Sequence, residues 1–342
     1  NRLMTSLAAG DGEDVIVLSG LDDNALAKKG VLMDLSDIVT PMEENGELLQ
    51  AIVDGEKAAD GKQQILPVRF ALPLLLSKEK RASEMTDLAA LAKAAEQTDG
   101  SLLGTFTGED LVETFAPYFM PDIIKDKQLD TEKLRTVLQE LQTIAAHCDM
   151  VEKYKKGERA SNGWNLPSAM QAVLCQISGF NDAMFDLAII NLVKGDYTSF
   201  ENAYIPTVEI GVNANTKQAD LAKEFAAFVM SREVQDGDFY DGFPVNKESL
   251  HMQVSLDRSD YAAYTTIEGA DGQEIGLDIE PIKAADADKL EALCDSLSKK
   301  TVKDAKVLEE LKKSVPDYLL GRQSLDDTIS KIQDGVKIYL AE

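Results

Sequence analysis

Residue types that often carry catalysis or bind metals are scarce in this chain. His147 and His251 are the only histidines, and His147 adjoins Cys148, so these neighbours point to different faces of a helix. The cysteines are too few and too widely spaced for a disulfide framework or a Cys-x-x-Cys zinc site, although one long-range bridge stays possible. The sequence contains no Gly-x-Ser-x-Gly turn, no Walker loop and no Gly-x-Gly-x-x-Gly motif. No cofactor and no metal are therefore expected.

One acidic loop invites comparison with a calcium site. Residues 236–242 read Asp-Gly-Asp-Phe-Tyr-Asp-Gly, but Tyr240 stands at a ligand position and no Glu closes the loop. Calcium binding is therefore not expected there. Elsewhere carboxylates are so numerous that a glycosidase-like acid pair cannot be recognised from their spacing. The enzyme interpretation is left without a set of catalytic residues.

The balance of charge narrows the class of partner. The 342 residues include 60 acidic and 35 basic side chains, a net charge of −25 at pH 7. Nucleic acids and anionic lipid surfaces are bound through Lys and Arg, so neither is expected as a partner. We expect a neutral or cationic solute, or a basic protein surface. No apolar run approaches the ~18 residues that span a bilayer, and the length suggests two domains.

Alternating strand and helix patterns indicate an α/β fold with mainly parallel sheets. Apolar runs of strand length predict strands at residues 14–18, 102–106, 185–192 and 209–213. Helical spacing predicts helices around residues 88–95, 111–119 and 134–145 and in the C-terminal tail, where Ser324 and Asp327 have the spacing of a capping box. A further helix is expected after residue 215, with Leu221, Phe225 and Phe228 facing inward.

A possible hinge lies near the end of the first quarter of the chain. Residues 65–70 and 71–76 have the pattern of extended segments interrupted by Pro67 and Pro73. Proline is found mainly at the edges and crossovers of sheets. This stretch is therefore predicted to be a hinge strand.

Three groups of segments follow a known pattern. The first is residues 3–18 and 27–35, a helix ending in Ala-Ala-Gly, a strand and a Gly-Val-Leu-Met-Asp-Leu stretch, with Glu13 where a Pro is usual. The second is residues 65–78, an extended segment that is similar to the strand that crosses between the lobes. The third combines Gly-Val-Asn-Ala-Asn-Thr-Lys from residue 211, Ala-x-x-Phe-x-x-Phe-x-x-Ser-x-x-x-Gln from residue 222 and Gly-Phe-Pro-Val-Asn-Lys from residue 242. With the closing helices they resemble the extracellular solute-binding proteins of bacterial ABC importers, in the family that carries sugars.

The resemblance implies a two-lobed periplasmic-binding-protein fold of type II with a hinge. Residues 1–72 and 207–254 would form lobe 1, and residues 73–206 and 255–342 would form lobe 2. Members of this family usually open with a strand, a helix and a second strand before the part that matches Asn1. Lobe 1 is therefore expected to be incomplete in this sequence.

The resemblance also implies where a solute would lie, in loops that follow strands of the two lobes. Trp164, the only tryptophan, would stack on the solute, with a core tryptophan as the alternative. Ser19, Leu21 and Asp22 follow the first strand, although Asp22 would also suit a helix N-cap.

Four further residues complete the candidate binding set. Thr107 and Glu109 follow a strand of lobe 2, although Glu109 would equally suit a helix N-terminus through the helix dipole. Phe70 and Tyr204 lie beside the crossovers and would face the cleft, with core packing as the alternative. Small or acidic residues stand at 284–287, where sugar binders of this family often have an aromatic, so peptides, cationic solutes and short saccharides stay open.

The expected function is the non-enzymatic substrate-binding component of an ABC transporter. It would capture a small solute, a carbohydrate in the first instance, between two lobes and deliver it to a membrane permease. The protein would be a monomer outside the cytoplasm, tethered as a lipoprotein on the outer face of the cytoplasmic membrane. The alternatives are a surface scaffold or adhesin that reuses the fold, and a carbohydrate-active hydrolase.

Overall fold

The structure is a computed structural model. It describes residues 6–7, 12–19, 21, 26–27, 29–125, 127–156, 158–161, 165–167, 170–237, 241–255, 263–269 and 272–341. Within these ranges no helix combines the length and the apolar character needed to cross a membrane. Predictions for Trp164 and Asp22, and for most of the helix expected before residue 10, concern residues outside the described ranges.

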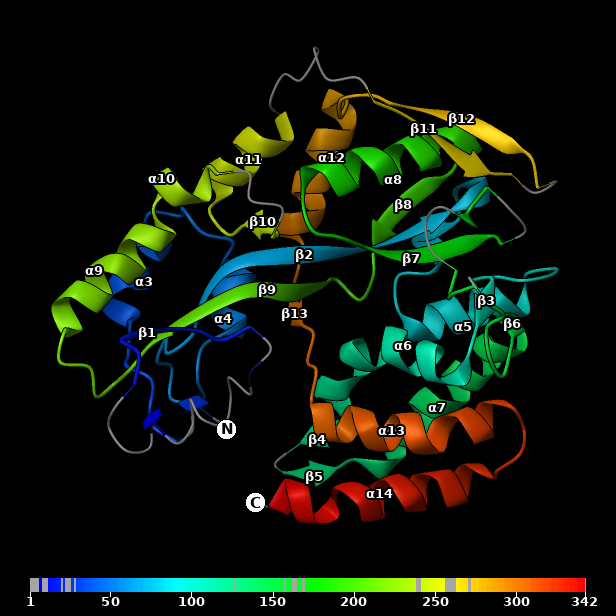
Figure 1. Ribbon diagram of the computed structural model, residues 1–342, viewed down its shortest axis with the longest axis horizontal. Helices are drawn as coiled ribbons and strands as arrows, with labels where there is room; N and C mark the ends of the chain where they lie inside the picture. The colour runs from blue at the N-terminus through cyan, green and yellow to red at the C-terminus, as the bar shows by residue number, and fades with distance from the viewer. Residues whose placement is uncertain are drawn as a thin grey trace.

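The strands are mostly short, apart from two long ones in the middle of the molecule (Figure 1). They are β1 (Val15–Val17), β2 (Leu66–Ser77), β3 (Thr105–Phe106), β4 (Ile124–Lys125), β5 (Gln128–Leu129), β6 (Asp149–Met150), β7 (Ala172–Ile177), β8 (Asp196–Ser199), β9 (Ala203–Val212), β10 (Phe243–Pro244), β11 (Ala263–Glu268), β12 (Glu274–Ile279) and β13 (Lys299–Lys300).

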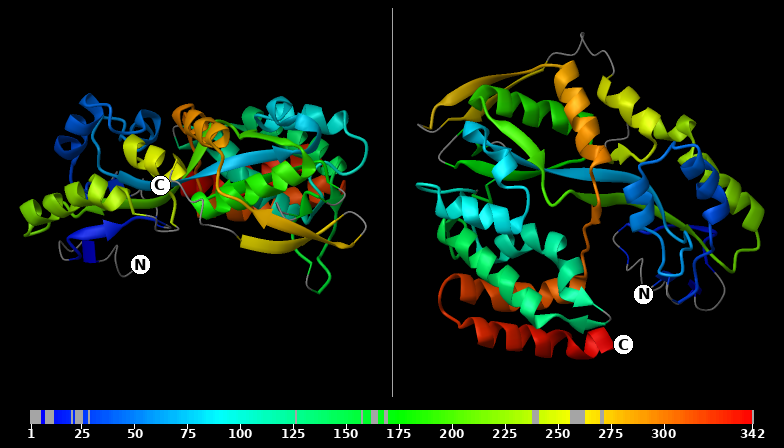
Figure 2. Two further views of the ribbon diagram at one scale, coloured as in Figure 1. Left: turned by 90° about the horizontal axis from the view of Figure 1, so that it is seen from above. Right: turned by 180° about the vertical axis from the view of Figure 1, so that it is seen from behind.

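The helices cover the sheet and form a separate bundle. They are α3 (Ser36–Glu44), α4 (Gln50–Gly55), α5 (Leu88–Glu96), α6 (Gly108–Ile123), α7 (Thr131–Ala146), α8 (Phe180–Val193), α9 (Ala219–Met230), α10 (Arg232–Gln235), α11 (Lys247–Ser255), α12 (Ala284–Asp295), α13 (Ala305–Leu319) and α14 (Leu325–Ala341), with short 3-10 turns η1 (Lys78–Lys80) and η2 (Ala82–Glu84). We call α5, α6, α7, α13 and α14 the helical bundle, and β1, α3, α4, β9 and α9 with the start of β2 the α/β half (Figures 1 and 2).

Short polar side chains fix where the bundle helices begin. Asp87, Thr107, Asp130 and Asp304 accept hydrogen bonds from backbone N–H groups in the first turns of α5, α6, α7 and α13. Such caps satisfy N–H groups that have no partner within the helix. The Asp327 N–H donates to the Ser324 hydroxyl at the start of α14, so the predicted capping position is confirmed.

Strand β2 connects the two parts of the sheet. Its first half pairs with β9, from Leu66 opposite Ile210, and its second half pairs with β7 and β8 up to Ser77. All of its residues are buried. The predicted interruption is wrong: Pro67 lies next to a register shift in the β2–β9 ladder, where a residue without an N–H is tolerated, and the strand continues through Pro73.

The expectation of mainly parallel sheets is also wrong. Among the described strands, β2 is antiparallel to β7, β8, β9 and β10, and β1 is antiparallel to β9. Parallel pairs join β3 to β6 and β13 to β9. Apolar runs predict strands but leave open which neighbour each strand finds, and here the long returning strand β9 lies beside β1 and β2.

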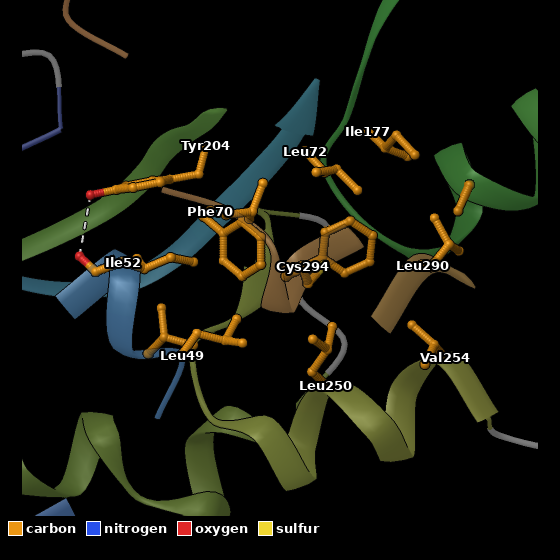
Figure 3. Packing of buried hydrophobic residues seen from close by; sticks show 14 of the residues in the cluster. Leu49, Ile52, Phe70, Leu72, Ile177, Tyr204, Leu250, Val254, Leu290 and Cys294 are labelled. Atoms are coloured by element: carbon orange, nitrogen blue, oxygen red, sulfur yellow. Dashed lines mark hydrogen bonds between the residues drawn. The ribbon is translucent and has the colours of Figure 1, made fainter. Parts of the chain in front are cut away.

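Two large apolar cores lie on either side of β2. One combines side chains of the α/β half with those of β7, α8 and α12, and includes Phe70, Leu72 and Ile177 (Figure 3). The other fills the helical bundle and includes Leu75 of β2. Because successive side chains of a strand point to opposite faces, Leu74 joins the first core and Leu75 the second.

Two helices differ from their predicted state or orientation. Residues 185–192, predicted as a strand, lie in α8, because an apolar run buried on several sides does not reveal its period. In α9, Leu221, Phe225 and Phe228 are 62, 49 and 44% exposed, so their predicted inward orientation is wrong. The small side chains Ala222 and Ala226 are buried instead, and they allow the helix to lie close to its neighbours.

A buried arginine ties the crossover to α10. The Arg69 side chain is 1% exposed, and its guanidinium donates to the carbonyls of Val234, Gln235 and Gly237 at 3.0–3.1 Å. A planar fork with several N–H groups suits this set of acceptors, whereas the ammonium of a lysine presents a single point of charge.

Substituting Arg69→Lys should lower the free energy of unfolding by about 2 kcal/mol or more, because buried carbonyls lose charged donors. Arg81→Lys is the matched control, since the exposed Arg81–Glu84 pair should contribute less than about 1 kcal/mol. Urea unfolding of both variants measures the difference. Equal losses in the two variants would contradict the role given to Arg69.

Candidate functional site

The loop after β1 is fastened to the crossover strand β9. Ser19 donates its hydroxyl to the Thr207 carbonyl at 2.9 Å and accepts from the Glu209 N–H at 3.2 Å. Leu21 is 42% exposed and its N–H donates to the Leu18 carbonyl, which closes a tight turn. Of the two predicted residues that the structure describes in this loop, Ser19 positions the loop and Leu21 is exposed to solvent.

A second polar edge lies where β3 and β6 end. These strands are parallel, so their carboxyl ends meet, and Thr107 follows β3 directly. The Thr107 N–H donates to the Tyr154 hydroxyl at 3.1 Å, while its own hydroxyl caps α6 and donates to Asp110 at 2.8 Å. Glu109 is exposed in the first turn of α6. Carboxyl ends of parallel strands are where open α/β sheets place ligands.

The sequence analysis missed Tyr154. Burial, followed by the hydrogen bond to Asp110, raises the pKa of Tyr154 to about 12, so its hydroxyl stays a neutral donor and acceptor. Its position after β6 was the available signal, but β6 itself was not predicted. The chain leading to Trp164 also reaches this edge, because the Ser161 hydroxyl accepts from the Thr105 N–H at 2.9 Å.

Phe70 and Tyr204 do not line an open site. Both side chains are fully buried, and the Phe70 ring packs on Phe243 with 5.9 Å between ring centroids. The Tyr204 hydroxyl donates to the Ile52 carbonyl at 3.2 Å (Figure 3). It also lies 3.4 Å from Glu56 Oε1. The predicted cleft-facing orientation is therefore corrected to core packing: neighbours from α4 and β10 cover the two rings.

A buried charged cluster surrounds the Tyr204 hydroxyl. The Lys300 ammonium of β13 pairs with Glu56 at the end of α4 and with Glu209 of β9, the latter at 3.0 Å. The Glu56 side chain has no exposed surface and that of Glu209 is 9% exposed. Burial raises the pKa of Glu56 to about 8, Lys300 opposes the rise, and Glu209 adds to it. A pKa near 8 means that the Glu56 carboxyl group carries its proton at pH 7.

The described residues include no group of three or more His, Cys, Asp and Glu side chains arranged to hold a metal ion. Cys148, Cys175 and Cys294 are free thiols. Asp236, which opens the acidic loop, pairs with Arg232 and accepts from the Ser249 hydroxyl. A cavity of about 240 Å³ lies between α8, β12 and the start of α12, and none of the predicted binding residues within the described ranges lines it.

Glu56→Gln should change how stability depends on pH. The pKa of Glu56 in the folded protein lies above its ordinary value of 4.5, so the unfolded chain releases this proton first and the free energy of unfolding falls as pH rises from 4.5 to 8. The free energy of unfolding of the wild type minus that of Glu56→Gln should decrease by up to about 1.4 kcal/mol per pH unit. This difference should become constant above pH 8. Urea unfolding at pH 5 to 9 measures this difference, and a difference that does not change with pH would contradict the assignment.

Glu309→Gln is the control. Lys313 and Lys306 lower the pKa of Glu309, so the free energy of unfolding of the wild type minus that of this variant should be constant above about pH 5.5.

Gly55 allows α4 to approach Tyr204, because a Cβ at this position would overlap the Tyr204 hydroxyl. Gly55→Ala should therefore cost about 1–3 kcal/mol of stability. In a Tyr204→Phe background the overlapping oxygen is gone, and the same substitution should cost less. Unfolding of the two single variants and the double variant tests this, with additive costs as the contradicting result.

The family of the chain follows from comparison with known proteins. The family model described as "Bacterial extracellular solute-binding protein" matches residues 1–236. No protein with a curated description matches this chain. Many solved structures match it.

Three solved structures illustrate the likeness in fold. The sugar-binding protein MalE of Xanthomonas citri is 15% identical with a TM-score of 0.64, over 99% of this chain and 87% of that one. A sugar transporter of Rhizobium etli in an open conformation is 15% identical with a TM-score of 0.61, over 98% and 87%. An ABC transporter solute-binding protein of Thermotoga lettingae bound with alpha-D-tagatose is 14% identical with a TM-score of 0.55, over 99% and 88%.

At this level of identity the solved structures establish the fold, which is that of two-lobed periplasmic binding proteins. The family match covers more than half of the chain. It includes the strand–loop segment at β1, the crossover strands β2 and β9, and α9. The chain therefore belongs to the family of bacterial extracellular solute-binding proteins.

Proposed function

We propose that this protein is the non-enzymatic substrate-binding component of an ABC importer and that it captures a carbohydrate. The family match over residues 1–236 carries this proposal. Relatives in fold add the solute class, since their names include a sugar transporter, a sugar-binding protein and complexes with alpha-D-tagatose and cycloalternan. A family of binding proteins supports capture without chemical change.

The lobes of the proposed binding protein are residues 1–72 with 207–254 and residues 73–206 with 255–342. Long strands β2 and β9 pass between them, which suits a hinge that closes the lobes on a solute. The loop edges after β1 and after β3 and β6 would supply the contacts. In this proposal Trp164 stacks on the sugar ring, and Ser19, Leu21, Asp22, Thr107, Glu109 and Tyr154 surround its hydroxyl groups.

The cellular setting follows from the same proposal. The protein works as a monomer on the outer side of the cytoplasmic membrane, anchored as a lipoprotein, and passes its solute to the permease subunits of the transporter. The match to an extracellular family supports this placement. The excess of carboxylates is compatible with a neutral sugar, whose hydroxyl groups donate well to carboxylate oxygens.

A thermal-shift screen with mono- and oligosaccharides tests the proposal. A bound sugar at 100 times its Kd should stabilise the protein by about 2.7 kcal/mol and raise its Tm by several degrees. The proposal would be contradicted if no sugar raised the Tm. Hydrolysis of a sugar by the protein would also contradict it.

Substitution of Trp164 tests the binding edge. Trp164→Ala should weaken binding of the sugar found in the screen by about tenfold or more, because the stacking surface is lost. Tyr264→Ala removes an exposed aromatic elsewhere and should leave the Kd unchanged. Isothermal titration measures both, and equal Kd values for wild type and Trp164→Ala would reject the role of this side chain.

A further inference from the structure

Strand β13 carries two adjacent lysines with separate sets of partners. It runs between α12 and α13, alongside the start of β9, with Lys299 opposite Ala203 and Lys300 opposite Tyr204 (Figure 1). Successive side chains of a strand point to opposite sides. The two ammonium groups can therefore bind different parts of the molecule at the same place in the chain.

Lys300 points to the α/β half. Its ammonium lies between the carboxyl groups of Glu56, at the end of α4, and Glu209, in the middle of β9. The lysine side chain is 16% exposed. Other groups around Glu56 are the Tyr204 hydroxyl and, farther off, Asp54 of α4, whose charge acts on Tyr204.

Lys299 points to the helical bundle. Its ammonium pairs with Asp122 in the last turn of α6 at 2.7 Å and with Glu201, in the turn between β8 and β9, at 3.1 Å. The second carboxyl oxygen of Glu201 accepts from the Leu88 N–H at the start of α5, at 3.0 Å. Lys299 is 21% exposed, so water screens these pairs less than it screens surface pairs.

Backbone hydrogen bonds show the same division. The Thr301 N–H donates to the Tyr204 carbonyl of β9 at 3.0 Å, and the next N–H, of Val302, donates to the Pro117 carbonyl of α6 at 3.0 Å. Lys299 and Val302 thus bind the bundle, and Lys300 and Thr301, which lie between them, bind β9 and its neighbour α4. The segment lies where the two parts of the molecule meet.

We propose that Lys299 and Lys300 form a two-sided clasp that holds the helical bundle and the α/β half in one relative orientation. The two lysines are positioning residues, since neither belongs to the proposed binding edges. Through this orientation the clasp sets how readily the lobes close on a solute. That last link rests on the proposed function, whereas the orientation is a property of the protein alone.

Spin–spin distances in the protein without solute test the clasp. Labels are attached at Asp60→Cys in the α/β half and Asp334→Cys on α14, both exposed positions. Cys175→Ser removes one native thiol. Burial raises the pKa of Cys148 to about 12 and also raises the pKa of the Cys294 thiol, so these two thiols react slowly with the label. The measurement is double electron–electron resonance at pH 7.

Lys299→Met and Lys300→Met should each shift or broaden the distance distribution, and Lys300→Arg should restore most of the wild-type distribution. Lys313→Met is the matched control and should change nothing, because among the residues that the structure describes Lys313 pairs only within α13, with Glu309 and Glu310. Circular dichroism establishes that each variant is folded. If Lys300→Met does not fold, the distance distribution of Lys299→Met alone tests the clasp. Its partner Asp122 is 47% exposed, so this carboxylate stays hydrated when the lysine is removed.

An unchanged distribution in folded Lys299→Met and Lys300→Met would overturn the clasp. Because no solute is present, that result would leave the proposed sugar binding untouched. Conversely, a shifted distribution supports the clasp even where the sugar screen finds no ligand. Once a sugar is known, both variants should also change its Kd, while Lys313→Met should not.

Discussion

A strand that is buried on both faces must satisfy its backbone polar groups within the protein, and β2 does so through other strands along most of its length. It pairs with β9 and β10 near its start and with β7 and β8 towards its end. Both apolar cores take side chains from it. The α/β half and the bundle are consequently arranged around one continuous element, and a change in their relative orientation has to be absorbed by β2, β9 and β13.

Charge is placed where these connecting segments meet. Burying a carboxyl group is costly unless it is neutralised or paired, and the structure does both at Glu56, Glu209 and Lys300. Lys299 adds a second, more hydrated set of pairs on the other side of the same strand. The two sets of pairs therefore join β13 to α4 and β9 on one side and to α6 on the other.

The candidate site was predictable in part. The family pattern located the loop after β1 and the position after β3, and the structure finds polar or exposed side chains at Ser19, Leu21, Thr107 and Glu109. Phe70 and Tyr204 were misjudged because their burial depends on α4 and β10, which approach from distant parts of the chain. Tyr154 was missed because only the parallel pairing of β3 with β6 brings it to Thr107.

The sequence alone determined the features that depend on near neighbours: the capped, amphipathic helices such as α7, the capping position at Ser324, and the motifs that indicate the family. Those signals are complete within a few residues. Only the tertiary structure decided that residues 185–192 are helical, that α9 turns its phenyl rings outward, and that Lys300 meets Glu56 from 244 positions away. The physical reason is that burial and pairing depend on which distant segment arrives beside a residue, and a local pattern does not specify that segment.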